Sequence, residues 1–399
     1  MNNKILFCGS SVPNEIEYQI KDISAAGNRF QNNFVDNLTD LGNAVEVLSF
    51  IGVPILDNIK SELLNPVTTE IMRATKTSGL GSDFIDQSIK RTYLFKQDST
   101  YGAIKNYHKQ LKKKLGNCNT VICYNVIYAW LTLPFMAKKA KVKSILILAD
   151  YSGPECFSNI ARKIYAYLQL YTMRRFDVVV GLSDNIESKL TRRQRFVLME
   201  GGIDQSLLDY FGEDSQNELI PIVVTKKSET ILMYSGLLSE VTGVNLLLEA
   251  MALIKNPDIR LVITGKGDLE YMVRSACKLD KRIIFKGHLQ YNEYLKCMKE
   301  ADILINPRNM DMPENQNNFP SKIIDYLAAG KVILSTRFAG WKKYRDNIFF
   351  CDSTSEIIAR NIEYLLKINE KVSGNVYEVN RKTASGFEWK TQIKELLEG

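Results

Sequence analysis

Apolar and polar positions follow one another along this chain in blocks that predict strands and helices in regular succession. In the first half, short runs of aliphatic and β-branched residues predict strands at 4–10, 44–50, 120–126, 143–149 and 177–183. In the second half, similar runs predict strands at 229–236, 258–265, 282–287, 302–307, 331–336 and 348–351. Because these runs are nearly continuous rather than alternating, we expect parallel strands that are covered on both faces.

Helical patterns lie between several of these strands, and one polar interruption divides the chain. The helical patterns cover 25–41, 127–139 and 157–176, whereas 51–100 carries no clear rhythm and is interpreted as a helical or loop insertion. Polar residues fill 213–218, which is typical of a linker. The sequence therefore predicts an α/β protein with two Rossmann-like, doubly wound domains, residues 1–212 and 213–380.

Composition agrees with a globular protein of two domains. The chain has 399 residues, of which 45% are hydrophobic and 24% charged, and a domain usually takes about 100–200 residues. No segment approaches the roughly 20 apolar residues of a membrane span, so we expect a cytoplasmic protein. The seven cysteines are scattered and the histidines number only two, so we expect reduced thiols and no metal site.

The net charge of +7 raises the question of an anionic partner. Basic residues gather at 109–114 and interrupt the aromatic and aliphatic helix predicted at 157–176. Such a helix suits peripheral contact with the inner face of an anionic membrane, and a solvated face over an ordinary core is the alternative. No nucleic-acid-binding module accompanies the charge, so nucleic acid is not an expected partner. The basic residues of the predicted helix are Arg162, Lys163, Arg174 and Arg175.

The segment 317–336 carries the strongest indication of chemistry. It reads Asn-Asn-Phe-Pro-Ser-Lys-Ile-Ile-Asp-Tyr-Leu-Ala-Ala-Gly-Lys-Val-Ile-Leu-Ser-Thr, in which a proline precedes and a glycine ends a short amphipathic helix. The start of this helix directs backbone N–H groups, Ser321 and the Lys322 ammonium toward one place, which favours phosphate. Asp325, one turn further on, can accept hydrogen bonds from hydroxyls. A phosphate site beside an acceptor for the two hydroxyls of a ribose indicates a nucleotide.

Further motifs surround this segment in a fixed order. They are Tyr-Ser-Gly-Leu-Leu-Ser-Glu-Val-Thr-Gly at 234–243, Gly-Lys-Gly-Asp-Leu at 265–269, Phe-Lys-Gly-His at 285–288 and Ala-Asp-Ile-Leu-Ile-Asn-Pro at 301–307. In this order the motifs resemble family-four glycosyltransferases of the GT-B fold, as in bacterial surface-polysaccharide enzymes. The resemblance is strongest over 176–352. It implies a terminal helix at 381–399 that crosses back to the N-terminal domain.

The resemblance implies a retaining, metal-independent hexosyltransferase acting in surface polysaccharide or glycoconjugate biosynthesis. The nucleotide-sugar donor, a UDP- or GDP-sugar, would bind the domain 213–380. A glycan or lipid-linked glycan acceptor would bind the domain 1–212, across a central cleft, and no cofactor is implied. The chain contains no Asp-x-Asp pair of the kind that holds a divalent ion, which agrees with metal independence.

The chain departs from the commonest family pattern at two positions. Leu237 and Thr242 stand where most members have an Arg and a Lys that hold the diphosphate. Lys322 and Arg308 are the expected replacement cations and the expected catalytic residues of the donor side. Solvated surface side chains are the alternative for both.

Other donor-side residues follow from the order of the motifs. Asn317 and Asp325 replace the family's carboxylate pair, and Asp325 keeps the expected ribose contact. Glu314 lies on the same loop as Asn317, and the sequence leaves open which of the two contacts the sugar. For His288 an exposed loop position is equally open. The remaining residues expected at the donor, besides Ser321, are Gly27, Gly236, Gly265, Lys266 and His288.

On the acceptor side, Asp150 ends a predicted strand, where ligands bind in open α/β sheets, and it is the third expected catalytic residue. An N-cap or turn aspartate is the alternative. No residue is a clear nucleophile, so the leaving phosphate is expected to accept the proton of the acceptor while the protein supplies positioning and charge. Two other classes stay open: a non-catalytic nucleotide-sugar-binding subunit of a glycosyltransferase complex, and a nucleotide-sugar epimerase.

Overall fold

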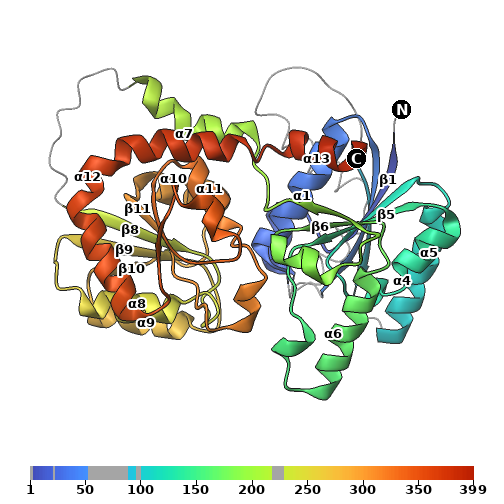
Figure 1. Ribbon diagram of the computed structural model, residues 1–399, viewed down its shortest axis with the longest axis horizontal. Helices are drawn as coiled ribbons and strands as arrows, with labels where there is room; N and C mark the ends of the chain where they lie inside the picture. Colours follow the sequence, from blue (N-terminus) through green and yellow to red (C-terminus); the bar gives the residue numbers. More distant parts are fainter. Residues whose placement is uncertain (1–2, 21–22, 53–88, 96–99, 218–228) are drawn as a thin grey trace. The chain divides into compact units, whose positions relative to one another are not determined.

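The computed structural model describes residues 3–20, 23–52, 89–95, 100–217 and 229–399. The chain forms two compact units (Figure 1): the first comprises residues 1–199 and 389–399, and the second residues 200–388. Each unit is built on one sheet, and every strand pair in both sheets is parallel. The prediction of two Rossmann-like α/β sheets is confirmed.

The sheet of the first unit has seven strands in the order β3-β2-β1-β4-β5-β6-β7. The strands are β1 (Lys4–Gly9), β2 (Ala44–Ile51), β3 (Lys90–Phe95), β4 (Thr120–Tyr124), β5 (Lys143–Leu148), β6 (Val178–Gly181) and β7 (Arg195–Leu198). The five predicted strands are confirmed, and the two edge strands, β3 and β7, are additions. Both begin with basic residues, and β7 is only partly buried, so neither has a continuous apolar run.

Strand β3 corrects the interpretation of 51–100 as a purely helical or loop insertion. The predicted insertion also covers 53–88 and 96–99, which lie outside the described residues. Because β3 pairs only with β2, at the edge of the sheet, it tolerates charged side chains: Lys90 is exposed, and the partly buried Arg91 donates a hydrogen bond to Ser11 Oγ at 3.2 Å.

Two helices of the first unit begin later than their apolar patterns indicate, at 133 and 160 instead of 127 and 157, whereas the helix predicted at 25–41 begins at Ala25. The helices of this unit are α1 (Ala25–Asp40), α4 (Thr100–Leu115), α5 (Leu133–Ala140), α6 (Ile160–Met173) and α13 (Trp389–Glu398). The helix predicted at 127–139 starts only at Leu133, with Pro134 in its first turn, where a missing N–H is harmless. Helix α13 packs on α1 through Trp389, whose ring lies edge-on to Phe30 at 4.9 Å.

The sheet of the second unit has six strands in the order β10-β9-β8-β11-β12-β13. The strands are β8 (Thr230–Ser235), β9 (Ile259–Thr264), β10 (Ile283–Phe285), β11 (Ile303–Asn306), β12 (Val332–Thr336) and β13 (Phe349–Cys351). All six confirm predicted strands. The helices are α7 (Gln205–Asn217), α8 (Val244–Leu253), α9 (Glu270–Leu279), α10 (Tyr291–Glu300), α11 (Lys322–Ala328) and α12 (Ser355–Ser385).

The predicted linker at 213–218 is wrong for residues 213–217, which form the end of α7. Glu and Gln are good helix formers as well as polar, so a polar run alone does not distinguish a linker from an exposed helix end. Our sequence boundary between residues 212 and 213 therefore falls within α7. At the other end, residues up to 385 belong to α12, and the terminal helix begins at Trp389.

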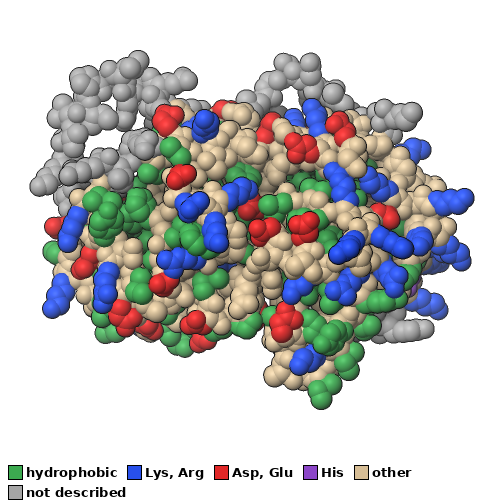
Figure 2. Space-filling view, viewed as in Figure 1, with side chains coloured by type: hydrophobic (Ala, Val, Ile, Leu, Met, Phe, Trp, Pro, Cys, Tyr) green, Lys and Arg blue, Asp and Glu red, His purple; other side chains and the backbone are tan. Residues whose placement is uncertain are grey.

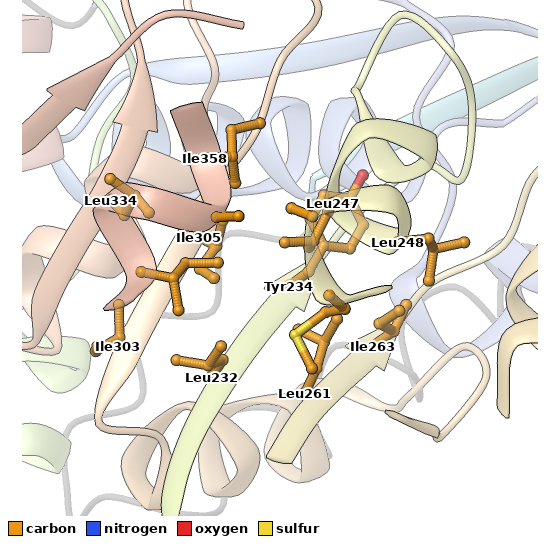
Figure 3. Packing of buried hydrophobic residues seen from close by; sticks show 14 of the residues in the cluster. Leu232, Tyr234, Leu247, Leu248, Leu261, Ile263, Ile303, Ile305, Leu334 and Ile358 are labelled. Carbon is orange, nitrogen blue, oxygen red and sulfur yellow. The ribbon is translucent and has the colours of Figure 1, made fainter. Parts of the chain in front are cut away.

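The strand order of each sheet reverses at one point, between β1 and β4 in the first unit and between β8 and β11 in the second. Ligands of open parallel sheets bind at such a point, outside the carboxyl ends of the strands. Below it, β8 and β11 pack into a fully buried apolar core that includes Leu232, Tyr234, Ile303 and Ile305 (Figure 3). This core fixes the positions of the loops that follow the two strands.

Candidate functional site

The loop after β8 lies against the loop after β9 in the second unit. The Gly236 N–H donates to the Thr264 carbonyl at 3.0 Å, and the Leu238 N–H donates to the Lys266 carbonyl at 2.9 Å. Gly265 has a φ of +138°, and a Cβ at this position would lie 1.8 Å from the Gly236 carbonyl oxygen. Only glycine permits this approach, so the two glycine loops form one rigid backbone floor beside the reversal of strand order.

Lys322 directs its ammonium group at this floor. The Nζ atom lies 4.3 Å from the centroid of the Tyr234 ring, and a Cβ on Gly236 would lie 2.9 Å from it. Part of the Lys322 side chain is exposed, but the Nζ atom itself is inaccessible and has no hydrogen-bond partner. Burial, and then the positive charge of Arg308, lower the pKa of Lys322 to about 7. A buried ammonium without an acceptor is unfavourable, and an anion would relieve that cost.

Arg308 provides a second cation close to Lys322. It lies two residues after the end of β11, and its Nη1 donates to Oδ1 of the buried Asn315 at 2.7 Å. The Nδ2 of Asn315 donates in turn to the carbonyls of Val241 and Asn309, at 2.7 Å each. The guanidinium is therefore held by a fixed amide. The sequence gives no sign of the role of Asn315, because its partners come from two segments, the loop after β11 and the loop after β8.

The sequence pattern predicted an amphipathic helix here, and this prediction is wrong. Helix α11 is buried on all sides, because every residue of Ile323–Ala328 is buried. Asp325 accepts a hydrogen bond at Oδ2 from the Tyr294 hydroxyl of α10, at 3.1 Å. The Tyr326 and Ser235 hydroxyls lie 3.0 Å apart and tie the helix to the end of β8. The carboxylate of Asp325 is thus oriented by its neighbours, and Tyr294 is a positioning residue that sequence reasoning missed.

The loop before α11 carries the two rival sugar contacts. One carboxylate oxygen of Glu314, Oε2, is buried without a hydrogen-bond partner. Asn317 is partly buried, and Ser321 is exposed at the start of α11 with no side-chain cap hydrogen bond. Glu314 therefore resembles Lys322 in presenting a buried polar atom that the protein does not satisfy.

Two further predicted residues lie on neighbouring loops. Lys266 is exposed between Gly265 and Gly267, and His288 is exposed directly after Gly287. The Gly265 N–H donates to the Gly287 carbonyl at 2.8 Å, so the two loops adjoin. The structure thus groups Lys322, Arg308 and the glycine floor, and places Lys266 and His288 at its solvent-exposed margin.

The two departures from the commonest family pattern bring no charge to this site. The Leu237 side chain is 56% exposed. Thr242 is buried, and its Oγ1 donates to the Leu237 carbonyl at 2.6 Å. Thr242 therefore stabilises the loop after β8 and does not supply the positive charge that a lysine would bring to this position.

In the first unit, Tyr124 at the end of β4 connects the two predicted residues Gly27 and Asp150. A Cβ on Gly27 would lie 3.3 Å from the Tyr124 hydroxyl. Burial, and then the charge of Asp150, raise the pKa of Tyr124 above its usual value. The Gly27 N–H donates to Ser24 Oγ at 3.3 Å, so it forms part of the cap of α1.

Asn125 fixes the carboxyl ends of β4 and β5. Its Oδ1 accepts hydrogen bonds from the Ala149 and Asp150 N–H groups, at 2.8 and 3.2 Å. Its φ of 54° lies in the left-handed region, which asparagine adopts more readily than most residues. A cavity of about 400 Å³ lies beside Asp150, at this end of the sheet.

Within the described ranges, no three His, Cys, Asp or Glu side chains are grouped so that they could hold a metal ion. All seven cysteines are free thiols. None of the helices in the described part of the chain is long and apolar enough to cross a membrane.

These features define the class of protein. Two all-parallel Rossmann-like units, with a cationic site where the strand order of the second unit reverses, form the GT-B fold of glycosyltransferases. Residues 215–381 match the family described as glycosyl transferases group 1. No curated protein sequence matches the chain at a significant level.

Solved structures of similar fold cover the whole chain. Alr3699/HepE from Anabaena, crystallised with UDP, is 16% identical, covers 99% of both chains and has a TM-score of 0.67. A glycosyltransferase from Rickettsia africae is 16% identical over 100% of this chain and 98% of its own, with a TM-score of 0.68. Sucrose-phosphate synthase from Thermosynechococcus elongatus is 13% identical over 99% and 98%, with a TM-score of 0.69. At these identities the similarity shows the fold alone.

Proposed function

We propose that this protein is a retaining, metal-independent hexosyltransferase. It transfers a sugar from a nucleotide-sugar to a glycan or lipid-linked glycan in surface polysaccharide or glycoconjugate biosynthesis, on the cytoplasmic side of the membrane. The observation that carries the proposal is the buried Lys322 Nζ, which has no hydrogen-bond partner and lies close to Arg308. Two cations at the reversal of strand order suit a diphosphate, which a nucleotide-sugar brings.

Each residue of the site has a role in this proposal. Lys322 and Arg308 bind the diphosphate, and the backbone of Gly236 and Gly265 allows it to approach closely. Asp325 accepts hydrogen bonds from the ribose. Glu314, whose buried Oε2 has no partner, contacts the transferred sugar in preference to Asn317. Lys266 and His288 lie toward the base, and Ser321 lies beside the phosphates.

The reaction needs charge stabilisation more than a nucleophile. The bond between the sugar C1 and the diphosphate oxygen breaks, and the acceptor oxygen forms the new bond on the same face. The acceptor proton passes to the leaving phosphate, whose negative charge Lys322 and Arg308 stabilise without reorganising. Asp150 positions the acceptor hydroxyl. Structures of Alr3699/HepE contain UDP and UDP-glucose, which supports UDP as the nucleotide of the donor.

Calorimetry of UDP binding tests the donor site. We expect UDP to bind equally well with and without EDTA. Lys322→Ala should weaken UDP binding by about 1.5–3 kcal/mol, because a charged hydrogen bond is lost, and should change uridine binding little. Lys278→Ala is the matched control, because this lysine is exposed on α9 of the same unit and has no role in the proposed site. Loss of UDP binding in EDTA, or equal effects of the two lysine substitutions, would contradict the proposed site.

One observation favours a second candidate, a non-catalytic nucleotide-sugar-binding subunit. The exposed Leu237 and the buried Thr242 leave the positions of both usual cations uncharged. Such a subunit would bind the donor but neither transfer nor hydrolyse the sugar. Release of UDP from a UDP-sugar, measured with and without an acceptor, distinguishes it from the transferase.

We also propose peripheral membrane contact through α6. Figure 2 shows apolar side chains gathered on the surface where α6 lies in Figure 1. A helix face in contact with water is normally polar, so this face suits the interface of a lipid bilayer, and its basic neighbours suit anionic lipids. The large apolar side chains that α6 exposes are Ile160, Ile164, Tyr167, Leu168 and Tyr171.

A further inference from the structure

The two end segments of the second unit lie side by side. Residues 200–203, where the chain enters this unit, form the entry segment, and residues 387–388, where it leaves, form the exit segment. The Ile203 N–H donates to the Phe387 carbonyl at 2.9 Å, and Ile203 pairs with Glu388 in a single parallel bridge. The two segments are therefore joined by their backbones at one place.

A buried carboxylate in the entry segment strengthens this junction. The Glu200 side chain is only 4% exposed, and its Oε2 accepts a hydrogen bond from the Tyr344 hydroxyl at 2.7 Å and pairs with the Lys343 ammonium. The Lys343 Nζ also lies 5.2 Å from the centroid of the Phe387 ring. The short 3-10 helix Trp341–Tyr344 thus holds the entry segment through Glu200 and the exit segment through Phe387.

Tyr344 connects the junction to the loop before α11. Its ring centroid lies 5.9 Å from that of Phe319, and the Phe338 ring packs edge-on against Phe319 at 5.3 Å. All three rings are buried. Phe319 lies three residues before Lys322, and Pro320 between them restricts the backbone. The position of Lys322 therefore depends on a ring cluster that Tyr344 supports.

The entry segment also contacts α11 directly. A Cβ on Gly201 would lie 2.7 Å from Cδ1 of Ile324, and Gly201 has a φ of +146°, which favours glycine. Glycine at this position allows the backbone of the entry segment to lie against the buried helix. The helix that begins at Lys322 is thus connected to the entry segment twice, once directly and once through the ring of Tyr344.

We propose that Glu200 is a positioning residue of the donor site, which links diphosphate binding to the entry and exit segments. A buried ion pair contributes little net stability, because desolvation offsets its attraction, so the role of Glu200 is to select one arrangement of the rings beside the loop that precedes Lys322. A diphosphate bound at Lys322 selects the same arrangement. Such a linkage is reciprocal, so the bound diphosphate also stabilises the contacts of Glu200. The inference rests on the proposed function and adds a residue outside the groups assigned to the donor.

Calorimetry of UDP binding to the full chain tests the linkage. Glu200→Gln keeps the size of the side chain and removes its charge, and we expect it to weaken UDP binding by about fivefold or more. Tyr344→Phe keeps the ring and removes only the hydroxyl, so it should also weaken binding and provides an independent test if Glu200→Gln folds poorly. Because both changes break the same contact, the double variant should bind UDP no more weakly than Glu200→Gln alone.

The matched control is Asp280→Asn. This carboxylate pairs with Arg282 directly before β10, at the opposite end of the strands from the donor site. The substitution therefore removes a carboxylate from an ion pair of the same unit, but we expect UDP binding to stay unchanged.

Hydrogen exchange of the same proteins supplies a readout that a loss of stability alone would not give. In the wild type, saturating UDP should slow the exchange of the peptide that contains Ile203, whose N–H bonds to the exit segment. In Glu200→Gln, saturating UDP should give less protection of this peptide.

The outcomes decide between linkage and a structural role. Equal UDP affinity of the wild type and Glu200→Gln, an equal loss in Asp280→Asn, additive losses in the double variant, or protection of Ile203 that does not depend on UDP would each overturn the linkage. If the wild type failed to bind UDP, the proposed donor site would be wrong and the linkage with it. The two failures are therefore distinguishable.

Discussion

Lys322 is the residue at which burial matters most for the proposed chemistry. Its Nζ atom is inaccessible beside Tyr234 and Gly236, and the nearby Arg308 adds repulsion. The sequence predicts a lysine at a helix start but not a buried one. An unsatisfied cation here is consistent with a site that is fully stable only when an anion is bound, as expected for pre-organised charge stabilisation.

The pH dependence of stability should report this buried ammonium. Lys322 has a pKa of about 7 in the folded protein against 10.5 for a free lysine. Between these values the unfolded chain holds one more proton, so the free energy of unfolding rises with pH. We expect Lys322→Met to be more stable than the wild type by about 1–3 kcal/mol below pH 7 and to lose this advantage as the pH rises from about 7 toward 10.5. Urea unfolding of the two ligand-free proteins at several pH values measures this difference in the free energy of unfolding. If the difference stayed the same at every pH, Lys322 would not be buried in solution.

Helix α6 shows how one element can serve two surfaces. One face lines the cavity beside Asp150, and the other exposes large apolar side chains. The basic residues predicted from the sequence lie among them: Arg175 stacks over the Tyr171 ring at 4.6 Å, and the Arg174 Nε donates to the Lys189 carbonyl. The apolar pattern of 157–176 predicts a helix, but periodicity alone does not tell which of its apolar faces remains uncovered.

Co-sedimentation with anionic vesicles tests the membrane contact of α6. Replacing Arg174 and Arg175 together by Glu should weaken binding by at least about 2 kcal/mol, at about 1 kcal/mol for each basic charge removed near the surface. Ile164→Ser should also weaken it, because an exposed apolar side chain is lost from the interface. The matched control is the exposed pair Lys112 and Lys113 of α4, also replaced by Glu. If both α6 variants bound the vesicles as the wild type does, this face of α6 would contact water and not the membrane.

At the scale of the whole molecule, the chain consists of two units that are each organised around one reversal of strand order. The cations and the glycine floor lie in the second unit, whereas Asp150 and its cavity lie in the first. A reaction that uses both sets of residues needs the intact chain. Because the charge on the leaving diphosphate grows as its bond to the sugar breaks, the loss of Lys322 should affect turnover as well as binding.

The stereochemistry of the product tests the complete mechanism. We expect the first-formed linkage to retain the anomeric configuration of the donor, since bond breaking and bond formation occur on the same face. Lys322→Ala should lower kcat at saturating donor by roughly tenfold or more, equivalent to at least about 1.4 kcal/mol of transition-state stabilisation. Proton NMR of the first product identifies the configuration. Inversion would exclude the mechanism, and tight donor binding without transfer or hydrolysis would favour the non-catalytic subunit.

The sequence by itself determined most of the architecture. Eleven of the strands were predicted, because buried parallel strands require nearly continuous apolar runs, and this is a local property of the chain. The edge strands β3 and β7 were missed, because a strand at an edge has less need of such a run. The start of α11 at Lys322 also follows from local signals, the proline before it and the glycine after it.

Only the tertiary structure decided how the candidate residues relate to one another. Lys322 meets Gly236, and Arg308 is held by Asn315, through contacts between segments that no local pattern connects. Tyr294 orients Asp325 from a different helix, and the cavity beside Asp150 exists because α6 packs across the ends of β4 and β5. Burial and hydrogen-bond partners depend on which distant segments fold together, and for that reason the sequence predicted the residues of the site but not their environment.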